Sequence, residues 1–86
     1  MKKDFVISNS EGLHARPATL LVSKANQFKS KIMLTLNNET VDLKSIMGVL
    51  SLGVQRGSLV TITTEGEDSA EAMEAISIII AENNLR

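Results

Sequence analysis

The residues with the clearest capacity for chemistry are Leu13-His14-Ala15-Arg16-Pro17. His14 is the only histidine of the 86-residue chain, and it stands where a helix-like pattern begins. A helix N-terminus presents unpaired backbone N–H groups and the positive end of the helix dipole, so it attracts anions. Neutral imidazole is a nucleophile, and the guanidinium fork of an arginine fits phosphate oxygens. This pattern predicts that His14 accepts a phosphoryl group and that Arg16 stabilises it.

Each of these residues also has a plain structural interpretation. A lone histidine at a helix start can be a cap or simply an exposed side chain, and a lone arginine is usually a solvated charge. Pro17 fits the first turn of a helix, where its missing N–H costs nothing, and it fixes where the helix begins. The spacing of His14 and Arg16, together with a second motif described below, favours the chemical interpretation.

The composition excludes several classes of protein and of site. The chain has no cysteine and one histidine, so disulfides and Cys-based or multi-histidine metal sites are excluded, and we expect neither a metal nor a cofactor. The net charge of −1 and the lack of Trp and Tyr argue against nucleic-acid binding. The longest apolar run, Ile78 to Ala81, is far too short to span a membrane, and the N-terminus has no signal-peptide pattern. We therefore expect a cytoplasmic protein that forms one domain over residues 1–86.

The hydrophobic pattern predicts seven elements. Strands are expected at residues 5–7, 32–36, 40–43 and 58–64, where β-branched and alternating residues gather. Helices are expected at about 15–28, with Ala18, Leu21, Val22, Ala25 and Phe28 on the buried face, at 46–52, and from Asp68 to about Asn83. Turns are expected at 8–12 and 37–39. Asp68 and Glu71 have the spacing of a capping box, and Ala72, Met73, Ile76, Ile79 and Ile80 form the apolar stripe of the last helix.

The order βαββαβα, with one apolar face per element, predicts an α+β fold of two layers. We expect an open-faced β-sandwich in which three helices cover one face of a four-stranded antiparallel sheet.

Ser45 introduces the second motif, Leu43-Lys44-Ser45-Ile46-Met47-Gly48-Val49. Serine before an apolar-periodic segment is a good N-cap. A phosphate at such a position adds negative charge where the helix dipole favours it, so the helix would persist while a partner bearing carboxylates would be repelled.

Together, the two motifs resemble those of the HPr family, the histidine-containing phosphocarriers of the bacterial phosphoenolpyruvate-dependent sugar phosphotransferase system. The resemblance covers essentially the whole chain, from the Gly12-Leu13-His14 context to Leu52-Gly53 after the second motif. It implies that enzyme I phosphorylates Nδ1 of His14, that Arg16 and Pro17 correspond to the arginine and proline of the family motif, and that the group passes to sugar-specific IIA components. It also implies that Ser45 is a regulatory site for HPr kinase/phosphorylase, whose product binds a catabolite-control transcription regulator.

A docking patch is expected beside His14. The short helix 46–52 cannot bury every side, and Leu20 lies off the buried stripe of its helix, so Leu20, Ile46, Met47 and Leu50 are candidates. Ile46 is equally well explained as core. Lys24, together with Lys44 and Thr19, is expected at the rim, where lysines attract acidic partners. A carrier that docks transiently is most simply a monomer.

Other interpretations compete with the carrier role. The first is a purely regulatory binding module that acts through phosphorylated Ser45, which would leave His14 and Arg16 without a purpose. An RNA-binding α+β domain lacks the aromatic residues, and an enzyme lacks the clustered acids and nucleophiles. Ile78 departs from the family pattern because it lies off the apolar stripe of the last helix, where a polar residue is usual.

Overall fold

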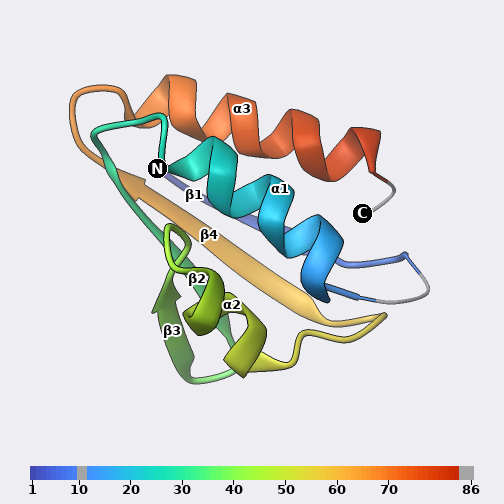
Figure 1. Ribbon diagram of the computed structural model, residues 1–86. Coiled ribbons are helices and arrows are strands. Elements are labelled where there is room, and N and C mark those ends of the chain that lie inside the picture. Colours follow the sequence, from blue (N-terminus) through green and yellow to red (C-terminus); the bar gives the residue numbers. More distant parts are fainter. Residues whose placement is uncertain (10–11, 84–86) are drawn as a thin grey trace.

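A four-stranded antiparallel sheet organises the molecule, in a computed structural model that describes residues 1–9 and 12–83. The strands are β1 (Lys2–Val6), β2 (Lys31–Leu36), β3 (Glu39–Asp42) and β4 (Leu59–Glu65), in the spatial order β1-β4-β2-β3. The helices are α1 (Ala15–Ala25), α2 (Ile46–Leu52) and α3 (Ser69–Glu82). All three helices lie on one face of the sheet, with α1 and α3 side by side and α2 near β3 (Figure 1). The predicted α+β fold and its element order are confirmed.

Alternation along the strands separates a covered from an open face. Val60, Ile62 and Thr64 of β4 are buried, and so are Ile32 and Leu34 of β2, which face the helices. The helices close this core with Ala18, Leu21, Ala25, Val49, Ala72, Met73, Ile76 and Ile80. Val22, Phe28 and Ile79, which were expected to be buried, are only partly so and pack at the edge of the core.

Several element boundaries differ from the sequence prediction. β1 begins at Lys2, because strand pairing with β4 includes the polar residues Lys2, Lys3 and Asp4, and Ile7 lies just beyond it in the core. α1 ends at Ala25, where Asn26 donates from Nδ2 to the carbonyl of Val22 at 2.8 Å. Phe28 then reaches the core from a turn rather than from a helix. Residues 10–11 of the predicted first turn lie outside the described residues.

The predicted capping box at Asp68 is wrong. Asp68 precedes α3 but makes no side-chain cap. Its carboxylate instead accepts hydrogen bonds from the backbone N–H groups of Lys29 and Ser30, each at 2.9 Å, and from the hydroxyl of Ser30. These donors, the Ser30 hydroxyl foremost, stabilise the charged form and hold the pKa of Asp68 below its ordinary value. The acid therefore ties the start of α3 to the start of β2.

Candidate functional site

His14 is the N-cap residue of α1, and its backbone is extended, with φ −89° and ψ −165°. Its carbonyl accepts the first helical hydrogen bond, from the N–H of Ala18 at 3.0 Å. Its imidazole makes no capping bond and is exposed. The extended N-cap backbone places His14 at the helix start, where the unpaired N–H groups of the first turn favour an anion.

Arg16 and Pro17 complete the first turn in different ways. Arg16 is exposed, so its guanidinium can reach an anion near His14. Pro17 is buried within the first turn, as expected for a residue that sets the helix start.

A second loop braces the segment before His14, and the sequence analysis did not identify it. The N–H of Leu13 donates to the carbonyl of Val54 at 2.9 Å. Gly12 adopts φ +66°, and a Cβ there would lie 2.3 Å from the same Val54 oxygen. Only glycine allows this close approach of the two backbones. Gly12 was therefore the sequence feature from which this contact could have been predicted. The segment between Gly53 and Ser58 thus holds in place the backbone that immediately precedes α1.

Ser45 is the N-cap of α2, as predicted. Its hydroxyl accepts from the N–H of Gly48 at 3.1 Å, and its carbonyl from Val49 at 3.0 Å. The side chain is exposed. Asn26 also donates from Nδ2 to the carbonyl of Lys44 at 3.0 Å, which links the end of α1 to the start of α2. No feature of the sequence pointed to this bridge.

The residues expected to form the docking patch differ in their exposure to solvent. Leu20 of α1 and Met47 and Leu50 of α2 are exposed, and Met47 is 76 % exposed. The two helices are in contact, so these three side chains belong to neighbouring surfaces. Ile46 instead packs against the core, and Lys24 is partly buried.

The candidates for the rim of this patch differ in their availability. Lys44 is not available there, because its Nζ donates to the carbonyl of Phe28 at 2.8 Å. Thr19 is exposed but donates its hydroxyl proton to the carbonyl of Ala15 at 2.7 Å, as helical threonines often do.

Two further observations concern the remaining surface. Ile78 is 48 % exposed, consistent with its place off the stripe of α3. No helix in residues 1–9 and 12–83 is long and apolar enough to cross a membrane.

Comparison with known proteins gives a consistent result. A family model described as the PTS HPr component phosphorylation site matches residues 1–82. The histidine-containing phosphocarrier protein of Mycoplasma superposes with a TM-score of 0.97 at 35 % identity, covering 99 % of this chain and 97 % of that one. The phosphocarrier protein HPr of Bacillus anthracis has a TM-score of 0.86 at 46 % identity, covering 92 % and 94 %.

A third similar structure is Crh of Bacillus subtilis, which is described as a catabolite-repression protein and a domain-swapped dimer. It has a TM-score of 0.76 at 40 % identity, covering 95 % of this chain and 94 % of that one. With the family model matching nearly the whole sequence and these folds superposing on the described elements, the chain belongs to the HPr family of phosphocarriers of the phosphotransferase system.

Proposed function

We propose that this chain carries a phosphoryl group on Nδ1 of His14, taking it from phospho-enzyme I and passing it to IIA components of sugar permeases. The observation that supports this most directly is the exposed imidazole of His14 at the start of α1, which is not used as a cap. We further propose that residues 1–86 act as one domain, as a monomer in the cytoplasm.

In the transfer, the lone pair of Nδ1 attacks phosphorus while the bond between phosphorus and the donor atom of enzyme I breaks. The electron pair of that bond leaves with the donor atom. The negative oxygens then face the N–H groups of the first turn and the guanidinium of Arg16. Each is a modest interaction, the dipole contributing about 0.3–2 kcal/mol. Modest stabilisation suits a carrier, because the group must leave again for the next protein.

Intact-protein mass tests the carrier role. The chain is incubated with phosphoenolpyruvate and enzyme I, in parallel with His14→Ala. We expect one acid-labile phosphate on the native chain and none on the variant. An unmodified native chain, with enzyme I active on a known HPr, would refute the carrier role.

A regulatory role of Ser45 is a second proposal, supported by its exposed hydroxyl and by the likeness to Crh, a catabolite-repression protein. We propose that HPr kinase/phosphorylase modifies Ser45 and that the product binds a catabolite-control regulator. Incubation with the kinase and ATP is expected to add one acid-stable phosphate, which is lost in Ser45→Ala. If His14 is not phosphorylated but Ser45 is, the purely regulatory interpretation becomes the better one.

The docking patch is tested by Met47→Glu. Because Met47 is 76 % exposed, the unfolding free energy is expected to change by less than about 0.5 kcal/mol. A carboxylate among the apolar contacts is expected to slow phosphorylation by enzyme I. Ile78→Glu is the matched control, since Ile78 is also exposed but lies on α3. Equal effects of the two variants would contradict this location of the patch.

A further inference from the structure

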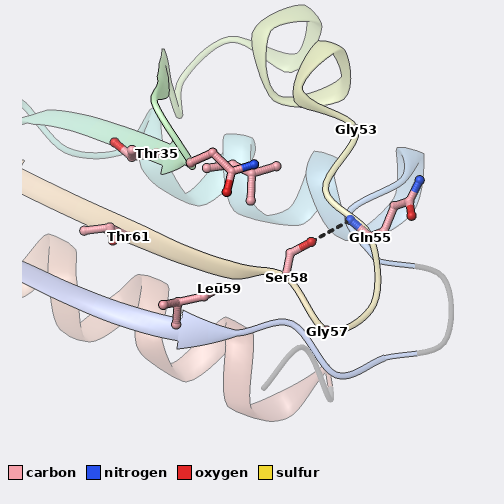
Figure 2. A pocket seen from close by; sticks show the side chains of 9 residues that line it. Thr35, Gly53, Gln55, Gly57, Ser58, Leu59 and Thr61 are labelled. Carbon is pink, nitrogen blue, oxygen red and sulfur yellow. Dashed lines mark hydrogen bonds between the residues drawn. The ribbon is translucent and has the colours of Figure 1, made fainter.

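A pocket of about 560 Å³ lies at the end of the sheet where β4 begins. Thr35 of β2 and Leu59 and Thr61 of β4 contribute from the open face, opposite the buried residues of the same strands. The segment Gly53–Ser58 closes the other side (Figure 2). Its volume is in the range of small-molecule sites.

The lining is polar but uncharged. It combines the hydroxyls of Thr35, Ser58 and Thr61 with the carboxamide residue Asn37 and the apolar residues Leu36 and Leu59. Among residues 1–9 and 12–83, those that line the pocket include no Lys, Arg, Asp or Glu. Leu59 is 55 % exposed, which leaves an apolar surface beside the hydroxyls.

The hydrogen bonds of the lining leave both a donor and an acceptor available. Thr61 donates its hydroxyl proton to Asp4 at 2.6 Å, so its oxygen is left to accept from a ligand. Ser58 accepts from the N–H of Gln55 at 3.2 Å, so its own proton is left to donate. A hydroxyl group needs both kinds of partner, because it is at once a donor and an acceptor. The carboxylate of Asp4 behind Thr61 disfavours an anion.

We propose that this pocket binds a small uncharged molecule bearing several hydroxyl groups, and that its occupancy is sensed at the start of α1. The wall of the pocket is the segment whose Val54 carbonyl accepts from Leu13 at 2.9 Å. The same segment is also bonded to Ile7, through Gly57 N–H at 2.6 Å and the Ser58 carbonyl at 2.9 Å. A ligand that shifts the wall therefore shifts the residue before His14.

Amide and imidazole NMR shifts of the isotope-labelled, unphosphorylated protein test both parts, independently of its phosphocarrier role. The probes are glucose and, as the anionic counterpart, glucose 6-phosphate. We expect saturable glucose shifts at Gln55, Gly57, Ser58 and Thr61, with an affinity in the millimolar range because the ligand is small and the pocket open. Smaller shifts of the same midpoint are expected at Leu13 and His14. Glucose 6-phosphate is expected to bind more weakly.

Two variants and a matched control make the test specific. Ser58→Ala and Thr61→Val each remove one hydroxyl and are expected to weaken glucose binding by about 2- to 10-fold, the effect of one hydrogen bond. Thr63→Val changes the same open face of β4 outside the pocket and is expected to leave the affinity unchanged.

The outcomes are distinct. Absence of saturable shifts, or an equal loss in Thr63→Val, would overturn the site. Tighter binding of glucose 6-phosphate would overturn the ligand class. Saturable shifts in the pocket with Leu13 and His14 unmoved would overturn the coupling.

Discussion

At the scale of single residues, Arg16 gives the sharpest prediction. It is exposed in the first turn of α1, so Arg16→Ala should leave the unfolding free energy within about 0.5 kcal/mol. A hydrogen bond to a charged group contributes about 1.5–3 kcal/mol, so loss of the guanidinium should slow phosphoryl acceptance by roughly 10- to 100-fold. Arg16→Lys keeps the charge but not the fork and should fall in between. An Ala variant that accepts phosphate at the native rate would remove Arg16 from the site.

Gly12 leads to a second prediction at the residue scale, because a side chain there would meet both backbone strain and a steric clash. Gly12→Ala is expected to be strained by φ +66° and to drive a Cβ against the Val54 carbonyl, which is 2.3 Å away. Gly53→Ala has a similar φ of +63° but nothing within 4 Å of its Cβ, so it should pay only the conformational cost of about 1–2 kcal/mol. Urea unfolding should show Gly12→Ala as the less stable variant. Equal losses of unfolding free energy in the two variants would mean that the contact between Leu13 and Val54 can shift at no cost to accommodate the new Cβ.

At the scale of elements, two substitutions at Ser45, the cap of α2, distinguish an effect on stability from an effect on docking. Ser45→Ala removes the acceptor for Gly48 N–H and is expected to cost about 1 kcal/mol, or roughly 4–8 °C in melting temperature. Ser45→Asp keeps a capping oxygen and adds a charge that the helix start favours, so it should melt near the native temperature. It should nevertheless slow phosphorylation of His14 by repelling acidic partners. A melting temperature of Ser45→Asp as low as that of Ser45→Ala would contradict the capping role assigned to the new carboxylate.

The elements also show what the sequence could predict. Alternation and helical spacing are local, so they located all seven elements, the start of α1 after His14 and the cap at Ser45. They failed where a distant contact decides the outcome. β1 includes Lys2 to Asp4 because β4 pairs with it, Asp68 bonds to Ser30 rather than to its own helix, and Lys44 is occupied by Phe28. The Leu13–Val54 brace belongs to the same class, since it joins segments some 40 residues apart in sequence.

At the scale of the whole molecule, the Asp68 carboxylate joins the start of α3 to the turn before β2, beside an exposed ion pair between Lys29 and Glu67 at 3.8 Å. In the folded protein the hydrogen bond from the Ser30 hydroxyl, with those from the Lys29 and Ser30 N–H groups, lowers the pKa of Asp68 below its ordinary value of 3.8. The unfolded chain therefore binds a proton at this residue more readily than the folded one. The resulting stabilisation is fully present above the ordinary pKa and is lost as the pH falls through the lower folded value.

Urea unfolding as a function of pH measures this contribution. The native midpoint is expected to fall as the pH drops below the ordinary Asp68 pKa of 3.8, and Asp68→Asn should be less stable at neutral pH and lose less stability on acidification. Glu74→Gln is the matched control, because Glu74 is an exposed acid on the same helix whose removal should leave the slope unchanged. Because the tie lies at the far end of α1 from His14, phosphoryl acceptance near neutral pH should be retained by Asp68→Asn as long as it is folded. Parallel pH profiles for Asp68→Asn and the native chain would show that packing, and not this carboxylate, holds α3 to the sheet.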